Sequence, residues 1–120
     1  MDTFTTRFAK PQDVSLILRF IRELADFEQL LHEVVADEKT LFQSLFQDPR
    51  GPEVLIAEEN GNPVGFALFF HNFSTFLGRK GIYIEDLYVS PECRGKGYGE
   101  KILQAICLLA KERNCGRVEW

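Results

Sequence analysis

The stretch IYIEDLYVSPECRGKGYGEKI, which runs from Ile82 to Ile102, decides how the rest of the chain is interpreted. Its first eight residues are mostly β-branched or aromatic and predict a strand over Ile82–Val89. Pro91 ends that strand, because proline cannot donate to a sheet ladder. A glycine-rich segment, Arg94–Gly99, follows and leads into an apolar-periodic run that predicts a helix. A strand, a glycine-rich turn and a helix in this order present backbone N–H groups to a phosphate at a helix N-terminus.

The glycine spacing excludes the two commonest nucleotide-binding loops. A P-loop requires Ser or Thr after its Gly-Lys pair, and Gly95-Lys96 is followed by another glycine. The dinucleotide fingerprint requires G-x-G-x-x-G, whereas Gly95, Gly97 and Gly99 are evenly spaced. A plain connector would not need three glycines, an arginine and a lysine in six residues, because each glycine costs conformational entropy. The segment therefore predicts a different phosphate-binding loop.

Composition limits the classes of protein to consider. A chain of 120 residues can form one domain with its own core, and 45% apolar with 27% charged residues is typical of a soluble globular protein. The net charge of −4 gives no reason to expect nucleic acid or an anionic membrane as partner, and mildly favours cationic ligands. No apolar run could span a bilayer and no signal peptide opens the chain, so we expect a cytoplasmic protein. Cys93, Cys107 and Cys115 lack C-x-x-C spacing and predict reduced thiols and no metal site.

The N-terminal half alternates between strand and helix patterns. Alternating residues predict a strand over Phe4–Phe8. Helical periodicity predicts a helix with Asp13 as its N-cap that ends near Phe27–Leu31. A second helix is predicted to begin at Asp37 and to end before the Pro-Gly-Pro cluster at 48–52. The apolar residues that we expect this second helix to bury are Leu41, Phe42, Leu45 and Phe46.

The C-terminal half predicts a meander of strands followed by a helix. Strands are expected over Glu53–Glu59 and Val64–Phe70, the second with an alternative end at Phe73, joined by an Asn-Gly turn, which is a strong hairpin signal. Ser74–Gly81 is predicted to be a polar connection into the central strand. The helix after the glycine-rich loop should end at Gly116, and Arg117–Trp120 is predicted to begin another strand.

The loop motif R-G-x-G-x-G at Arg94–Gly99 resembles the pyrophosphate loop with which the GNAT N-acetyltransferases hold coenzyme A. Three further segments are similar to the diamine (spermidine/spermine) acetyltransferase branch and to the thialysine acetyltransferases beside it. The element order β-α-α-β-β-β-α-β is that of the first two thirds of the GNAT fold, so the resemblance covers the whole chain. It implies one α/β (α+β) domain over residues 1–120, with a mixed, mostly antiparallel central sheet flanked by helices. The three further segments are Ile21–Glu28 (IRELADFE), Ser74–Gly78 (STFLG) and Tyr83–Val89 (YIEDLYV).

The resemblance implies transfer of an acetyl group from acetyl-coenzyme A to a primary amine of a small cationic substrate. Glu85 would face the amine and accept its proton, with Asp86 beside it, and Phe27 and Glu28 would also contact the amine. On a strictly alternating strand Glu85 and Asp86 point to opposite faces. The residues alone leave open that both are solvated strand charges and that Glu28 is a solvated helix end. The resemblance assigns coenzyme contacts to the backbone of Leu87, Tyr88 and Val89, and to a loop comprising Arg94, Gly95, Lys96, Gly97, Tyr98, Gly99 and Glu100, with Arg94 and Lys96 adding charge.

One departure from the family pattern bears on the substrate. Polyamine enzymes of this branch carry an acidic residue and a Trp where Ser74 and Phe76 stand here. This favours small diamines or lysine-like amines over long polyamines. Two alternatives come from other classes: a non-catalytic acyl-coenzyme A-binding module, and an incomplete chain that is active only with its missing C-terminal part.

The end of the chain adds an expectation about assembly. The family re-protonates the coenzyme A thiolate from a Tyr on a helix after the next strand, and the sequence stops at Trp120 before that helix. No residue is therefore matched to the general acid. We expect a C-terminally incomplete domain whose open sheet edge favours a homodimer, and which acetylates poorly in isolation.

Overall fold

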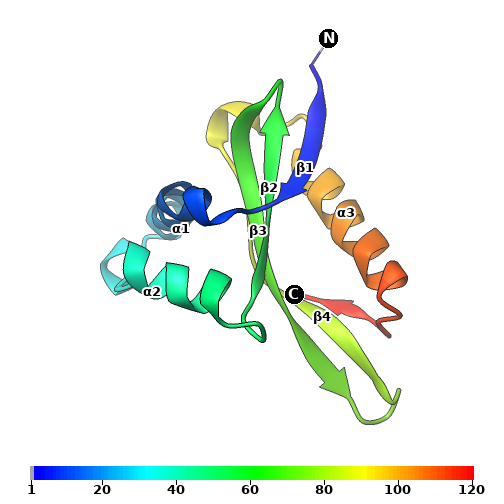
Figure 1. The fold of residues 1–120 in the computed structure, drawn as a ribbon. Coiled ribbons are helices and arrows are strands. Elements are labelled where there is room, and N and C mark those ends of the chain that lie inside the picture. Colours follow the sequence, from blue (N-terminus) through cyan, green and yellow to red (C-terminus); the bar gives the residue numbers. More distant parts are fainter. Residues whose placement is uncertain (1) are drawn as a thin grey trace. The chain divides into compact units, whose positions relative to one another are not determined.

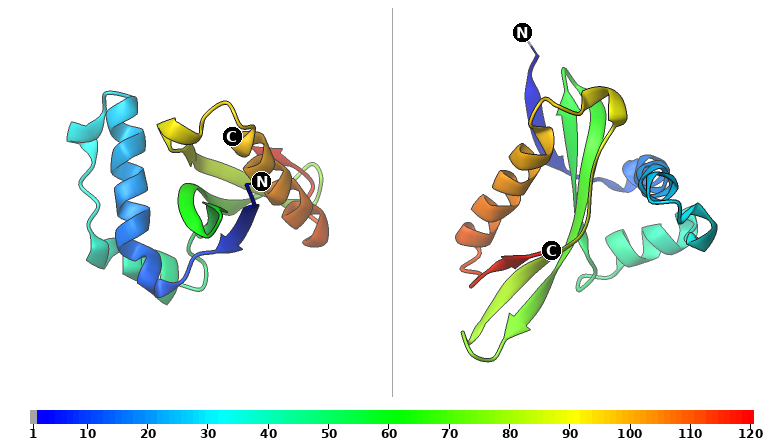
Figure 2. Two further views of the ribbon diagram at one scale, coloured as in Figure 1. Left: turned by 90° about the horizontal axis from the view of Figure 1, so that it is seen from above. Right: turned by 180° about the vertical axis from the view of Figure 1, so that it is seen from behind.

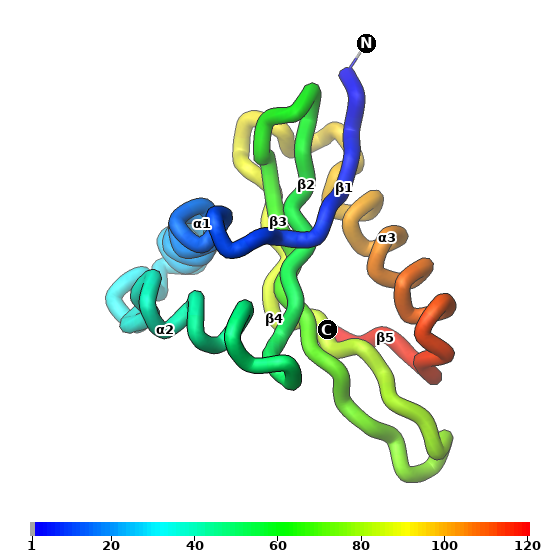
Figure 3. Tube along the Cα trace, viewed as in Figure 1, coloured from blue at the N-terminus to red at the C-terminus, as the bar shows by residue number. Residues whose placement is uncertain are grey.

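The computed structural model describes residues 2–120 and divides the chain into two compact units. One unit consists of residues 2–8 and 52–120 and contains the sheet. The other consists of residues 9–51 and is helical. Figure 1 labels the α-helices and strands β1 to β4, and Figure 3 also labels β5.

The sheet unit has five strands in the order β1-β2-β3-β4-β5. The first four pair antiparallel in sequence order, and β5 pairs parallel with β4. Helix α3 (Tyr98–Glu112) connects β4 to β5 and lies across one face of the sheet (Figure 2). The expected mixed, mostly antiparallel sheet and the element order are both confirmed. The strands are β1 (Phe4–Phe8), β2 (Glu53–Glu59), β3 (Asn62–Ser74), β4 (Arg79–Val89) and β5 (Val118–Glu119), of which β1 and β2 have the predicted bounds.

The core of this unit forms where α3 packs on the sheet. Ile102, Ile106 and Ala110 recur at every fourth residue of α3, so they share one helical face, and all three are buried. They pack with the side chains that alternate onto one face of each strand. The sheet residues of this cluster include Leu55, Ala57, Ala67, Phe69, Ile82 and Ile84.

The β3–β4 hairpin is longer than the sequence pattern predicts. The expected polar connection over Ser74–Gly81 is wrong, since Phe73 pairs with Lys80 and Ser74 with Arg79, and only residues 75–78 form the turn (Figure 3). Beyond the pair that Phe69 makes with Glu53, β2 does not continue alongside the hairpin. An exposed two-stranded ribbon does not need an apolar face, so its polar residues hide the strand pattern.

The helical unit contains α1 (Val14–Phe27) and α2 (Glu38–Phe42), which continues as a π-helical turn over Gln43–Gln47. The second helix begins at Glu38, one residue after the predicted start, and Asp37 is its N-cap, because the Asp37 Oδ1 accepts the Thr40 N–H at 2.8 Å. Asp13 precedes α1 as predicted, but its carboxylate accepts the Lys10 N–H at 2.7 Å. The burial expected for the second helix is wrong, because its hydrogen-bond ladder changes register after one turn and no continuous apolar face forms. Phe42 is exposed, and Leu41, Leu45 and Phe46 are half-buried.

The described residues hold neither a long apolar helix nor a metal-binding cluster. Within residues 2–120 no helix could cross a bilayer. No group of three or more His, Cys, Asp or Glu side chains in this range is arranged to hold a metal ion. Cys93, Cys107 and Cys115 are free thiols, and burial is the main cause that raises the pKa of Cys93.

A charged cluster joins the end of α3 to the sheet. Arg113 donates to both carboxylate oxygens of Glu53, from Nη1 at 2.6 Å and from Nη2 at 2.9 Å. The same Nη1 lies 3.2 Å from His71 Nε2, which can accept only in the neutral imidazole. Burial lowers the pKa of His71, and the positive charge of Arg113 lowers it further. Glu53 Oε2, 3.9 Å from His71 Nδ1, opposes this shift only in part, so this cluster favours the neutral imidazole.

The cluster predicts a pH dependence of stability. His71 binds a proton less readily in the folded than in the unfolded chain, so its contribution is present above about pH 6.5 and is lost as the pH falls through the folded pKa. Urea unfolding at pH 7.5 and pH 5.0 should show a smaller loss of unfolding free energy for His71→Gln than for wild type. At pH 7.5, Arg113→Met should cost about 1–2 kcal/mol, because it removes two charge-assisted hydrogen bonds. Equal pH slopes in wild type and His71→Gln would contradict the assignment.

Candidate active site

The glycine-rich loop takes the shape that its glycines permit. Gly95 and Gly97 have φ values of +85° and +77°, in the left-handed region that residues with a Cβ rarely adopt. Nothing lies within 4 Å of a Cβ placed on either residue, so the space beside both is open. Gly97 is also the N-cap of α3. The loop therefore exposes backbone, rather than side chains, at the start of a 15-residue helix.

The amides of this loop are available to a ligand. Among residues 2–120, the N–H groups from Gly95 to Glu100 donate to no protein acceptor, and the first helical bond from the loop is Lys101 N–H to the Gly97 carbonyl at 3.1 Å. Unpaired amides at a helix N-terminus, together with the helix dipole, bind anions. The open space and free amides fit a diphosphate.

Strand β4 carries one more residue than β3 in its middle. Leu68 pairs with Asp86 and Phe69 pairs with Ile84, so Glu85 is the extra residue of a β-bulge. The effect is visible in the packing. Ile82 and Ile84 lie in the α3 core, and beyond the bulge Leu87 and Val89 pack against it.

The bulge corrects the expectation that Glu85 and Asp86 point to opposite faces. Since Ile84 and Leu87 both pack on the α3 side, the two carboxylates between them are both left off that side. Glu85 is exposed and Asp86 is half-buried. The structure thus brings two adjacent carboxylates to one place on the strand, which strict alternation would have separated.

The edge of β4 that faces β5 is open along most of the strand. Within the described residues, only Ile82 and Tyr83 pair with β5. Farther along, the Val89 carbonyl accepts from Arg94 Nε at 3.2 Å, so Arg94 folds back toward the strand. The backbone beside Leu87 therefore has no strand partner on this side, as expected for a strand that receives an extended ligand.

The side chains of the predicted coenzyme segment mostly pack within the protein. Leu87 and Val89 are partly buried against the core, as expected. The Tyr88 ring is buried against Phe66, with ring centroids 6.5 Å apart, so only its backbone remains for a ligand. A Cβ on Gly99 would lie 3.7 Å from Leu87 Cδ2, which places the start of α3 beside β4.

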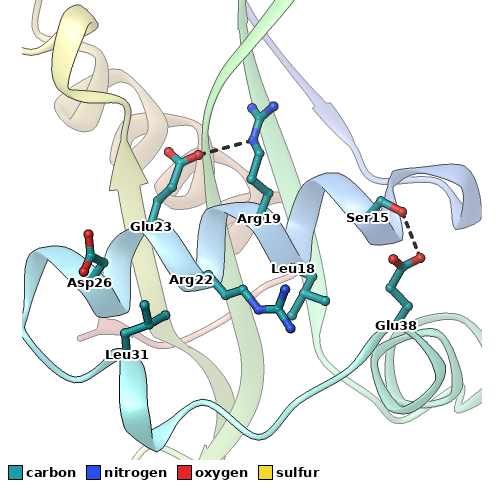
Figure 4. A pocket seen from close by; sticks show the side chains of 8 residues that line it. All are labelled: Ser15, Leu18, Arg19, Arg22, Glu23, Asp26, Leu31 and Glu38. Carbon is teal, nitrogen blue, oxygen red and sulfur yellow. Dashed lines mark hydrogen bonds and ion pairs between the residues drawn. The ribbon is translucent and has the colours of Figure 1, made fainter.

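Phe27 and Glu28 belong to the helical unit, whereas Glu85 belongs to the sheet unit. Phe27 ends α1 with 65% of its surface exposed, and the exposed Glu28 is the C-cap. This unit has a pocket of its own along α1, where Arg19 Nε lies 3.3 Å from a Glu23 carboxylate oxygen (Figure 4). The pocket does not include Phe27 or Glu28, and its lining is Ser15, Leu18, Arg19, Arg22, Glu23, Asp26, Leu31 and Glu38.

The sequence pattern misses one residue that contacts the loop. Lys96 Nζ lies 2.8 Å from Glu59 Oε2, and the Tyr98 hydroxyl donates to the same oxygen at 2.5 Å. Glu59 precedes the Asn-Gly turn between β2 and β3, so it is 37 residues from Lys96. No local motif links these positions. A carboxylate at a strand end next to a hairpin turn is the one available signal, and it is common in solvated turns.

Comparison with known proteins identifies the class. The Acetyltransferase (GNAT) family matches residues 18–120, so this chain belongs to the GNAT acetyltransferases. The family implies an N-acetyltransferase that takes its acetyl group from acetyl-coenzyme A. The phosphate-binding loop and the central strand described above fit that donor.

Individual relatives are informative at different levels. The chain is 38% identical to the thialysine N-epsilon-acetyltransferase of Bos taurus, over 93% of this chain and 70% of that protein. It is 30% identical to the L-ornithine N5-acetyltransferase NATA1 of Arabidopsis thaliana, over 95% and 70%. A solved aminoglycoside acetyltransferase from a soil metagenome superposes with a TM-score of 0.81 over 98% of this chain and 76% of that one. At 17% identity, this last match shows the fold alone.

The left-handed conformation of Gly97 predicts a local effect on coenzyme A binding. Gly97→Ala adds a Cβ that costs about 1–2 kcal/mol in this conformation and so reorients the amides that follow. Calorimetric titration should show coenzyme A binding at least tenfold weaker. Gly78→Ala is the matched control, since Gly78 has φ +64°, equally open surroundings and a place in the distant β3–β4 turn. Equal weakening by both variants would contradict a role for the loop.

Proposed function

We propose that this protein transfers the acetyl group of acetyl-coenzyme A to the side-chain amine of a small lysine- or ornithine-like amino acid. One observation carries the proposal. Glu85 and Asp86 are left together at the β4 bulge, two residues and one residue before Leu87, whose side chain lies beside the start of α3. A strand rises about 3.3 Å per residue, so these two residues lie within about 7 Å along β4 of the point that adjoins the free amides.

The amine must lose a proton before it can attack the thioester. A lysine-like ammonium has a pKa of about 10.4 in water, so very little of it is neutral at pH 7. Glu85 is exposed at the bulge and accepts that proton, directly or through a water molecule. Asp86 adds negative charge that holds the cationic substrate nearby. In this assignment Glu85 is the base and Asp86 a binding residue.

The reaction then exchanges one bond for another at the acetyl carbon. The neutral amine nitrogen attacks the thioester carbonyl, the C–N bond forms and the C–S bond breaks, and coenzyme A leaves as a thiolate. The attacking nitrogen releases one further proton to solvent as the amide forms. The unpaired edge of β4 beside Leu87 and Val89 offers backbone groups to the acyl carbonyl and the pantetheine arm. A thiol has an ordinary pKa of about 8.5, so the thiolate can recover its proton from solvent.

The amino-acid substrate class is favoured over polyamines by two independent features. The relatives at 38% and 30% identity are named for acetylation of thialysine and of ornithine. Ser74 ends β3 and the fully exposed Phe76 lies in the turn that follows, so this hairpin lacks the acidic residue expected for a long polycation. We assign Phe27 and Glu28 to the substrate side as well, since Glu28 supplies a further carboxylate.

A panel of amines tests the substrate class. With acetyl-coenzyme A and detection of the free thiol, thialysine, lysine and ornithine should give higher kcat/KM than putrescine, and putrescine higher than spermine. Spermine should rank last because it carries four ammonium groups, whereas the bulge offers a single carboxylate pair. Preference for spermine would refute the amino-acid assignment, and no turnover of any amine would refute the proposed function.

The proposed base predicts a specific kinetic defect. Glu85→Gln keeps the size of the side chain and removes its proton acceptor, so kcat should fall about 100-fold at pH 7.5. The defect should shrink as the pH rises toward 10, because more of the amine is then already neutral. The Kd for coenzyme A should change less than twofold.

A matched variant separates this effect from a general loss of charge. Glu112→Gln removes an exposed carboxylate from the last residue of α3, about 20 Å of helix away from the loop. It should retain wild-type kcat. If Glu85→Gln also retained wild-type turnover at pH 7.5, the carboxylate at the bulge would be structural.

A further inference from the structure

The ammonium group of Lys96 in the loop is paired with carboxylates of the protein itself. Lys96 stands between Gly95 and Gly97. Its Nζ lies 2.8 Å from Glu59 Oε2 and 3.7 Å from Asp2 Oδ2. Two carboxylates therefore share this ammonium. The family resemblance led us to expect that Lys96 adds charge to the phosphate cradle, but its charge is compensated in this structure.

Tyr98 holds the other side of Gly97 through the same carboxylate. Its hydroxyl donates to Glu59 Oε2, and its ring lies 4.5 Å from the Phe4 ring, centroid to centroid, with only 5% of its surface exposed. The hydrogen bond to Glu59 is the main cause that raises the pKa of Tyr98 to about 12. The hydroxyl is therefore a donor throughout the neutral range. Hydrogen bonds from Lys96, and then from Tyr98, lower the pKa of Glu59, which is a carboxylate there.

Glu59 lies where it can hold the glycine-rich loop in position. It is the last residue of β2 and pairs with both Phe4 and Asn62, so its backbone is held between two strands. Gly95 and Gly97 have no side chains and touch nothing on their Cβ side. Side-chain packing therefore does not fix the two glycines themselves, and the loop depends on its neighbouring residues for its position. The contacts of Lys96 and Tyr98 with Glu59 are the ones that bracket Gly97 and anchor it to the sheet.

We propose that Glu59 is a positioning residue for acetyl-coenzyme A. Its carboxylate ties Lys96 and Tyr98, on either side of Gly97, to the end of β2 and so orients the loop amides toward the pyrophosphate. Lys96 then acts as a tether and not as a phosphate ligand. The proposal rests on the proposed function only for the identity of the ligand.

The sign of one measurement separates the tether from a direct phosphate contact. Glu59→Gln removes the charge that engages Lys96 while keeping a side chain of the same size. If Glu59 positions the loop, calorimetry should show coenzyme A binding about tenfold weaker. If Lys96 binds phosphate directly, the same variant releases its ammonium and binding should become tighter. Unchanged or tighter binding by Glu59→Gln would overturn the proposal.

A second donor distinguishes positioning of the phosphates from a general structural defect. S-acetylpantetheine carries the same thioester but lacks the pyrophosphate. Glu59→Gln should lower kcat/KM about tenfold with acetyl-coenzyme A and less than twofold with S-acetylpantetheine. Equal losses with both donors would mean that Glu59 only supports the fold. If no amine is acetylated, the proposed function fails while coenzyme A titration still tests the positioning role.

Three further variants complete the test. Lys96→Met should weaken coenzyme A binding about as much as Glu59→Gln, and the double variant should be no weaker than either, because both break one tether. Tyr98→Phe removes a single hydroxyl and should weaken binding about three- to fivefold, which keeps the proposal testable if Glu59→Gln unfolds. Glu58→Gln is the matched control, because Glu58 is the neighbour of Glu59 on β2 and its carboxylate lies 3.2 Å from Arg7 Nε of β1. This variant should bind coenzyme A as the wild type does. Additive losses for Glu59→Gln and Lys96→Met would contradict a shared tether.

Discussion

The extra residue in β4 determines which side of the sheet each later side chain occupies. If β4 alternated regularly through Glu85, with no bulge, Asp86 would point into the α3 core and Leu87 would leave it. A carboxylate facing Ile102 and Ile106 would be buried without a partner, which is costly. The register shift therefore does two things at once. It keeps the α3 core apolar, and it leaves two carboxylates together outside it.

The position of α3 follows from the same shift, because Leu87 lies beside Gly99 at the start of the helix. The helix begins where the left-handed glycines of the loop allow the chain to turn, and its free amides lie next to the strand edge that β5 leaves open. The carboxylates at the bulge and the start of α3 thus both adjoin one strand. The contacts of Glu59 bring the β2–β3 turn into this arrangement as well.

Local sequence patterns predicted the elements whose structure depends on interactions between residues close in sequence. The alternation in Phe4–Phe8 and the glycine-rich loop before α3 depend on neighbouring residues, and each was found where the sequence placed it, while the second helix begins one residue after its predicted start at Asp37. The bulge could not be predicted, because it is a mismatch between two strands and depends on the partner Leu68 as much as on Glu85. The partner of Lys96 was missed for the same reason. The carboxylate that it contacts is distant in sequence and becomes adjacent only when the β2–β3 turn forms.

The pairing of β1 with β2 has a consequence for how this chain can diversify. Phe8 pairs with Leu55, so the helical segment between them leaves the sheet and returns to it at neighbouring strands. Such a segment is a connection between two paired strands. Doubling the length of a flexible connection costs only about 0.6 kcal/mol of closure entropy. The segment that carries Phe27 and Glu28 can therefore accept insertions and exchanges while the β1–β2 ladder stays intact. Changes of length or sequence in this segment leave the strand pairing of the sheet unit unchanged.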